Sequence, residues 1–450
     1  MRVLVIAVTV SAVMLMEGSP AWSQTGGSGS PFRGLFGRAS DRPARHALDV
    51  SFSLAEAYDS DVPPELAVVD PSALVASGAS TIFMGNAAYQ WKGTRTQFGA
   101  SGSSALRYYN ELQSLQTVSH SAGLGLRTRL GGRATLSVDG RAAYSPPYLL
   151  GLFPQGSAGE PGEALPAPPD YVVNDSDSYS YGTTARVTYG PSLRTQLSVA
   201  ADVGYTDFVE ESELRRDTAF RGLEGGFSRN VSRNVALDAG YRFRTGDFGY
   251  GLDGETVEHG VDVGLEYRRP LSATRTAVLS ASLGSTFMQV PASAAGPPSA
   301  GDEGPGSAGR EDWFLSGQAG FAYPFSKTWR GHATVRRGTS YVPELTEPVL
   351  TTGFSTGLEG MLGSRADLSA AAGYSSGTSA FGGGASLLDT YTGKVQVRVG
   401  LTPTLATYAE YVYYFYDFGE NVRLAPGVPS GLERNGVRVG LTLWVPALRR

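Results

Sequence analysis

The feature that most constrains the fold of this chain is a regular alternation of apolar and polar side chains along stretches of about a dozen residues. One stretch, Arg133–Tyr144, has Ala134, Leu136, Val138, Gly140, Ala142 and Tyr144 on one face and Arg133, Thr135, Ser137, Asp139 and Arg141 on the other. A period of two is typical of a β-strand with one apolar face and one wet face. Similar stretches follow one another from Ala47 onward, and they predict an all-β fold.

The gaps between the predicted strands alternate between short and long. Lys92-Gly93 follows the second predicted strand and Gly131-Gly132 follows the fourth, and such residues are typical of tight turns. The gaps after odd-numbered strands are longer, as at 145–175 and 291–311. Short turns at one end and long loops at the other are typical of membrane-spanning barrels. The sequence therefore predicts a transmembrane antiparallel up-and-down β-barrel of about 18 strands (16–18), with short periplasmic turns and long extracellular loops.

The beginning of the chain has the features of a secretory signal. The basic residue Arg2 precedes the apolar run Val3–Met16, and small residues at 21 and 23 indicate cleavage before Gln24. The following segment is rich in Gly, Ser, Pro and Arg, which predicts a flexible periplasmic lead segment. We therefore expect a signal peptide at 1–23, the lead segment at 24–46 and the barrel at 47–450, placed in the outer membrane of a Gram-negative cell.

The composition excludes several classes of protein. The 450 residues contain no Cys, which excludes disulfides, thiolate metal sites and Cys nucleophiles. A net charge of −5 lacks the basic excess of a nucleic-acid-binding surface. The four His residues stand in no metal-binding or catalytic motif. We expect no enzymatic activity, no cofactor, no bound metal and no nucleic-acid partner.

The polar faces of the predicted strands carry charged side chains of both signs. An ionised group on the lipid side of a barrel costs ~2–4 kcal/mol near mid-membrane, so we expect these side chains to line the lumen. A barrel of about 18 strands leaves room for water inside. Two interpretations of the arginines stay open: they favour anions or polar sugars, or they pair with carboxylates and brace the wall. The predicted lumen-lining residues are Arg127, Arg129, Arg133, Asp139, Arg141, Arg186, Asp202, Asp238, Arg242, Arg244, Asp262, Glu266, Arg398 and Glu410.

Aromatic residues near the strand ends form a second group. Tyr and Trp concentrate at the headgroup level of membranes because their rings are only partly apolar. We expect such residues to anchor the barrel. The predicted aromatic girdle consists of Trp91, Tyr144, Tyr189, Tyr205, Tyr241, Tyr267, Trp313, Trp329 and Trp444.

The last predicted strand, Gly436–Val445 (GVRVGLTLWV), alternates cleanly and resembles the closing strand that the barrel-assembly machinery reads, although six residues follow Trp444. With the signal, the alternation and the turn asymmetry, it makes the whole mature chain resemble outer-membrane β-barrel proteins of the porin-like kind. The resemblance implies a channel for passive passage of hydrophilic solutes, in contact with outer-membrane lipid and lipopolysaccharide. Two alternatives stay open: a barrel that exports an exopolysaccharide with a periplasmic export partner, and a structural or adhesive surface barrel.

Overall fold

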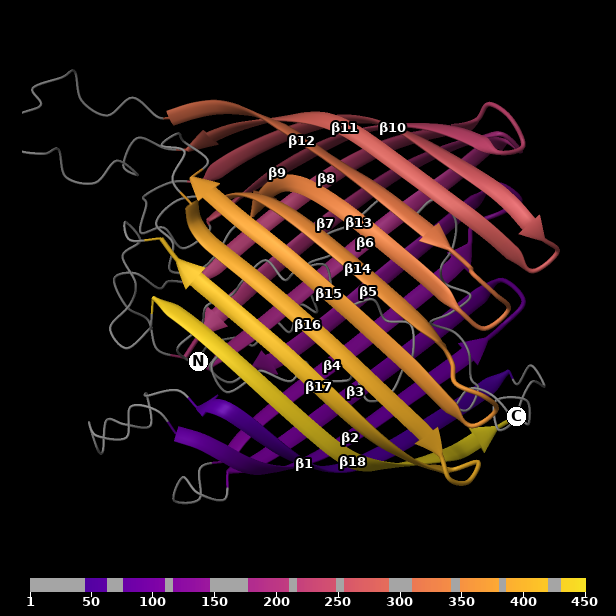
Figure 1. Ribbon diagram of the computed structural model, residues 1–450. Coiled ribbons are helices and arrows are strands. Elements are labelled where there is room, and N and C mark those ends of the chain that lie inside the picture. The colour runs from indigo at the N-terminus through magenta and orange to yellow at the C-terminus, as the bar shows by residue number, and fades with distance from the viewer. Residues whose placement is uncertain are drawn as a thin grey trace, which may run out of the picture.

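The chain forms one closed antiparallel barrel of 18 strands (Figure 1). The computed structural model describes residues 45–62, 76–109, 116–145, 177–209, 217–247, 255–290, 310–340, 349–379, 386–419 and 430–450. The all-β barrel and the strand number that the alternation predicts are confirmed. The strands are β1 (His46–Val62), β2 (Ala76–Lys92), β3 (Thr96–Tyr109), β4 (Gln116–Arg129), β5 (Ala134–Ser145), β6 (Ser178–Ser192), β7 (Thr195–Phe208), β8 (Thr218–Asn230), β9 (Val235–Asp247), β10 (Thr256–Ser272), β11 (Arg275–Val290), β12 (Arg310–Tyr323), β13 (Arg330–Ser340), β14 (Val349–Met361), β15 (Ala366–Ser379), β16 (Ser386–Gly400), β17 (Leu405–Phe418) and β18 (Gly431–Arg449).

Some of the sequence predictions fall on other parts of the chain. The signal peptide at 1–23, its cleavage site before Gln24 and all but the last two residues of the lead segment lie outside the described residues. Among the described residues, no helix has the length and apolar character needed to cross a membrane.

The first and last strands complete the ring. Each strand pairs with its neighbours in the sequence, and β1 pairs with β18 from Ala47↔Arg449 to Asp59↔Gly436. An ion pair between Arg449 and Asp49, 2.5 Å long, crosses this joint. A sheet in lipid needs such closure, because the hydrocarbon offers no hydrogen bonds to a free strand edge.

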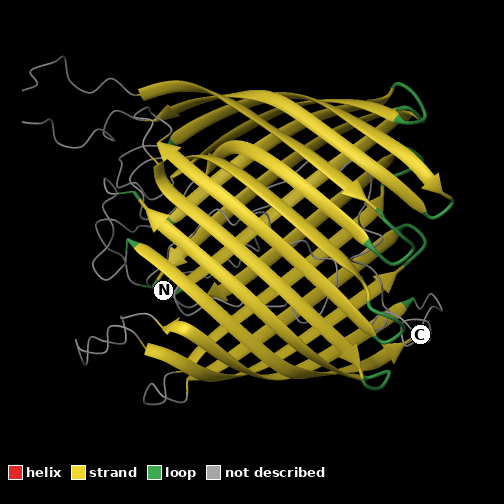
Figure 2. Cartoon of the chain, in the orientation of Figure 1, coloured by secondary structure: helices red, strands yellow, loops and turns green. Residues whose placement is uncertain are grey.

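The tight turns after the even-numbered strands gather at one end of the barrel (Figure 2). Gly131 in the β4–β5 turn has a φ of 141°, and Gly363 in the β14–β15 turn has a φ of 87°. Residues with a Cβ atom rarely adopt this left-handed region, so these turns favour glycine. In the β8–β9 turn a hydroxyl shapes the backbone instead, because Ser232 Oγ accepts the N–H groups of Asn234 and Val235 at 3.2 and 3.1 Å.

The outward phase of the described strands is mostly apolar. On β1, Phe52 and Leu54 are 54% and 47% exposed, whereas Ser53 between them is buried and hydrogen-bonds to its neighbours. Soluble proteins rarely expose apolar surface of this extent, whereas a barrel in lipid does. Other exposed apolar side chains of the same phase include Phe83, Leu124, Val199, Leu223, Val263, Leu283, Leu315, Val335, Val395, Val439 and Leu441.

Most of the predicted girdle lies on this outward phase, near the two ends of the barrel. Trp329 precedes β13 in the turn region and donates its indole N–H to the Met361 carbonyl at 3.0 Å. The outward girdle residues are Trp91, Tyr189 and Tyr267 toward the turn end, Tyr144, Tyr205 and Trp313 toward the loop end, and Tyr241 between them.

The girdle prediction is wrong for Trp444. Its side chain is 7% exposed and lies on the inward phase, opposite Ser51, in contact with the buried Ala406. The outward phase of β18 consists of the valines and leucines at 437, 439, 441, 443 and 445, so Trp444 falls between two of them. Its place in the alternation, rather than its aromatic ring, determines the face.

Candidate functional site

The inward phase of the described strands carries most of their charged side chains. The predicted lumen residue Arg133 lies elsewhere, in the exposed turn between β4 and β5, where its guanidinium donates to the Pro191 carbonyl at 3.2 Å. The inward phase keeps the other charges away from the apolar outer surface, as the cost of a charge in lipid requires. The strand register places these residues on it: Arg127, Arg129, Asp139, Arg141, Arg186, Asp202, Asp238, Arg242, Arg244, Asp262, Glu266, Arg398 and Glu410.

Strands β3–β9 form a basic side of the interior. We call Arg127, Arg129, Arg141, Arg186, Arg242 and Arg244 the arginine wall; each is half-buried or exposed. The wall extends along the barrel from Arg129, beside the β4–β5 turn, to Arg244 near the loop end of β9. The described inward phase of β3–β9 also carries Arg107 and the carboxylates Asp139, Asp202, Glu224 and Asp238, so cations exceed anions there.

An ion pair links two strands of the wall that are not direct neighbours. Arg186 on β6 donates to Glu224 on β8 at 3.2 Å, across the intervening strand β7. The two side chains are 21% and 32% exposed, so water screens the pair and its contribution to stability is small.

Strands β15–β18 form a packed side of the interior, and Glu410 on β17 is its centre. The Glu410 side chain has no exposed surface. Its carboxylate accepts Arg438 Nη2 at 2.5 Å, Lys394 Nζ at 3.0 Å and Gln396 Nε2 at 3.0 Å. Strands β16, β17 and β18 are thus joined through one carboxylate.

Other predicted lumen residues also belong to packed parts of the wall. Arg398 is 3% exposed and pairs with Asp367 at 2.8 Å, and Glu266 on β10 is 9% exposed and pairs with Arg268. The bracing interpretation of the sequence therefore describes the contacts of Arg398, Glu266 and Glu410. The arginine wall, by contrast, reaches solvent.

Several inward carboxylates lie over glycines of a neighbouring strand. Asp262 on β10 lies against Gly240, where an added Cβ atom would approach Oδ1 to 2.6 Å, and Asp139 on β5 lies similarly against Gly125. Asp202 occupies the space over Gly222. Glycine at these positions lets the carboxylates lie along the wall, which keeps their bulk out of the lumen.

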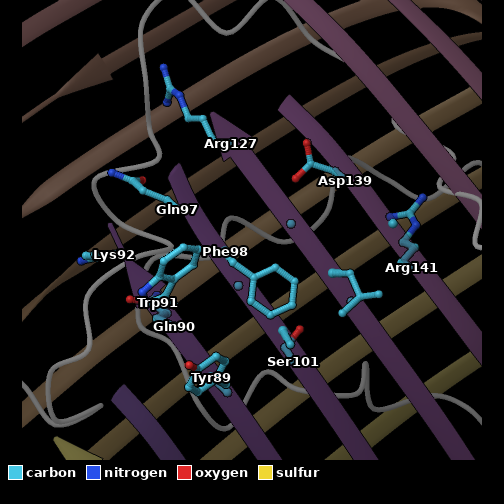
Figure 3. Close-up of a pocket in the computed structure, with 17 residues that line it drawn as sticks. Tyr89, Gln90, Trp91, Lys92, Gln97, Phe98, Ser101, Arg127, Asp139 and Arg141 are labelled. Atoms are coloured by element: carbon cyan, nitrogen blue, oxygen red, sulfur yellow. The ribbon is translucent and has the colours of Figure 1, made fainter. Parts of the chain in front are cut away.

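A hollow of about 580 Å³ lies at β2–β5, where four glycines thin the wall. Figure 3 shows Gln97, Arg127, Asp139 and Arg141 around it, on neighbouring strands. Its lining also includes outward residues such as Tyr89, Trp91, Phe98 and Leu124, because Gly99, Gly123, Gly125 and Gly140 leave little but backbone between the two faces. The hollow is thus lined both by Arg127 and Arg141 of the arginine wall and by the amide side chains of Gln90 and Gln97.

The sequence reasoning did not single out the uncharged members of this region. Gln90 and Gln97 share the inward phase with Ser101 and line the hollow. Their place in the alternation is a signal that was available. An amide side chain, however, costs much less free energy in lipid than a charged one, so its presence in a strand indicates the inward face less clearly.

Comparison with solved structures finds outer-membrane porins of similar architecture and very different sequence. No protein-family model and no curated protein matches the chain. OccK11 (OpdR) of Pseudomonas aeruginosa is 12% identical, with 89% of this chain and 96% of that chain covered and a TM-score of 0.39. OccK2 (OpdF) of the same organism, in complex with glucuronate, is 9% identical (90% and 98% covered, TM-score 0.42), and Acinetobacter baumannii OccAB1 is 9% identical (91% and 100% covered, TM-score 0.44). The likeness concerns the porin-like barrel architecture alone.

Proposed function

We propose that this protein is an outer-membrane channel for the passive passage of hydrophilic solutes. The observation that carries the proposal is the opposition of its two surfaces: apolar and aromatic outside, charged and partly solvated inside. A barrel of about 18 strands is wide enough to enclose water. In this proposal the tight turns face the periplasm and the long gaps face the exterior, as in other barrels of the outer membrane.

We further propose that the channel favours anionic solutes. The arginine wall reaches solvent and is staggered along the barrel axis, whereas much of the opposite side is packed and charge-paired. Successive cationic groups along a water-filled path lower the barrier for an anion and raise it for a cation. Arg127 and Arg141, which both line the hollow at β2–β5, are the residues where this preference is tested most directly.

The test is the current through the purified full chain in a planar bilayer. We expect discrete conductance steps, and a reversal potential in a KCl gradient that shows anion preference. A correctly folded barrel that carries no current would contradict the channel. Current without any preference for chloride over potassium would contradict the anionic specificity alone.

A matched pair of variants distinguishes the effect of the arginine wall on ion selectivity from the general effect of removing positive charge. The double change Arg127→Gln and Arg141→Gln removes two inward cations, and we expect the reversal potential to move toward zero. Arg133→Gln removes a cation from the exposed turn, and we expect the reversal potential to stay at the wild-type value. Equal shifts in the two proteins would show that the selectivity has another origin.

A further inference from the structure

The pairing between β12 and β13 stops early at the loop end of the barrel. The ladder has seven pairs, from Tyr323↔Gly331 to Gly317↔Arg337, whereas every other ladder among the described strands has at least ten. On their other edges, β12 pairs with β11 as far as Arg310 and β13 pairs with β14 as far as Ser340. We call the unpaired edges, residues 314–316 of β12 and 338–340 of β13, the β12–β13 seam.

A hydrogen bond shows where the end of β13 lies. Thr339 Oγ1 donates to Glu258 Oε1 on β10 at 3.1 Å, although β11 and β12 stand between these strands. Three strand spacings of ~4.8 Å place β10 and β13 about 14 Å apart around a regular wall. An extended Thr and Glu joined by this hydrogen bond span only about 10 Å between Cα atoms. The loop end of β13 therefore leaves the wall and leans into the barrel, toward β10.

Beside and within the seam, residues 313–315 of β12 are apolar, whereas residues 338–340 of β13 are small. Trp313 and Leu315 point outward and are 67% and 60% exposed, while Phe314 points inward. Opposite them, Gly338 adjoins open space: an added Cβ atom would have no heavy atom within 4 Å. Phe314 is 7% exposed and the neighbouring Met288 on β11 is fully buried, so these two inward side chains are covered.

We propose that the β12–β13 seam is a lateral opening through which a single-chain amphiphile moves between the lumen and the outer leaflet. Its apolar chain contacts the exposed side chains of Trp313 and Leu315, and its polar head stays in the wet lumen. The unpaired backbone groups of the seam find hydrogen bonds with water or with that head, because lipid offers none. The inference rests on the proposed membrane location and not on ion conduction.

Three single-cysteine variants on β13 test the opening, since the chain has no other Cys. Gly338→Cys lies at the seam, Thr334→Cys lies on the inward phase where β12 and β13 are paired, and Val335→Cys lies on the outward phase. Each is labelled with a bimane fluorophore in phospholipid vesicles and quenched with a doxyl-labelled fatty acid. We expect quenching at 338 close to that at 335, and only background quenching at 334.

The outcomes separate this inference from the proposals on which it rests. Quenching at 335 with none at 338 would overturn the lateral opening and leave the membrane location intact. The absence of quenching at 335 would overturn the membrane location, and the opening with it. Repeating the experiment with the doxyl group on a phospholipid distinguishes the sources of the chain: quenching at 338 by the free acid alone assigns the opening to single-chain solutes.

A cross-linking experiment tests the same seam without a ligand. The continued register places Ser316 opposite Gly338, so the pair Ser316→Cys and Gly338→Cys forms a disulfide only where the seam is closed. The pair Gly320→Cys and Thr334→Cys faces itself in the same ladder and serves as the control. We expect oxidation to cross-link the control pair and not the seam pair. Equal disulfide yields for the two pairs would show that β12 and β13 are paired at the seam, and would overturn the proposal.

Discussion

The buried carboxylate of Glu410 offers a quantitative test of how the packed side of the barrel is held together. Glu410→Gln keeps the shape of the side chain and removes its charge. The change leaves Arg438, 1% exposed, and Lys394, 11% exposed, as buried cations without the carboxylate that accepts their hydrogen bonds at 2.5 and 3.0 Å. Removing one partner of a buried pair costs about 3–5 kcal/mol, because the other charge remains desolvated. We expect a loss of this size in the free energy of unfolding.

The assay is equilibrium unfolding in urea, in lipid vesicles, followed by tryptophan fluorescence. Glu224→Gln is the matched control, because its ion pair with Arg186 is 3.2 Å long and partly exposed, and such pairs contribute about 0–1 kcal/mol. A double variant, Glu410→Gln with Arg438→Met, should recover part of the lost unfolding free energy, because the buried charge of Arg438 is then removed as well. The reasoning is refuted if the two single variants lose the same amount of stability.

Two further pairs of variants test the packing of the wall. An alanine Cβ at Gly284 would overlap the Val261 carbonyl, so Gly284→Ala should cost about 1–3 kcal/mol, whereas Gly225→Ala, with open space around it, should not destabilise the barrel; thermal unfolding of both proteins measures the difference, and equal unfolding temperatures would count against the close approach. Trp444→Ala removes a side chain that is 7% exposed and should cost ~3–5 kcal/mol, more than Trp313→Ala, whose side chain is 67% exposed. The reverse order in urea unfolding would mean that Trp444 does not pack inside.

The architecture could be predicted from the sequence, because in each strand the alternate side chains face either lipid or the lumen and differ in polarity accordingly. The stretch Arg133–Tyr144 alternates in the printed sequence, and Ala134–Ser145 is β5 in the structure. The last strand was predicted as Gly436–Val445 and extends over Gly431–Arg449, since its pairing with β1 and β17 continues where the alternation weakens. Period-two patterns identify a strand better than they fix its ends.

The contacts in the interior were harder to predict. The alternation indicates whether a side chain points inward or outward, but it does not indicate which residues that side chain contacts. Arg141 and Arg398 look alike in the sequence and both point inward. Arg141 is exposed, while Arg398 is 3% exposed and paired with Asp367 on the neighbouring strand. The early end of the β12–β13 ladder is marked only weakly in the sequence. The apolar alternation of β13 stops after Val335, where Arg336 and Arg337 follow one another, but this pattern does not say which neighbouring strand loses its pairing.

The joint between β1 and β18 has a consequence for the order in which the chain folds. All other ladders join consecutive strands. Their closest partners are 3 residues apart for Ser192 and Thr195 and 33 for Ser145 and Ser178, whereas Asp49 and Arg449 are separated by 400 residues. The entropy of loop closure grows as 1.5RT ln n, so this contact costs about 4 kcal/mol more to form from an open chain than a hairpin turn does. Hairpins are thus expected to form first, and closure comes last as one cooperative event. Any factor that holds β1 near the incoming β18 would remove most of this entropic barrier and so set the rate of barrel formation.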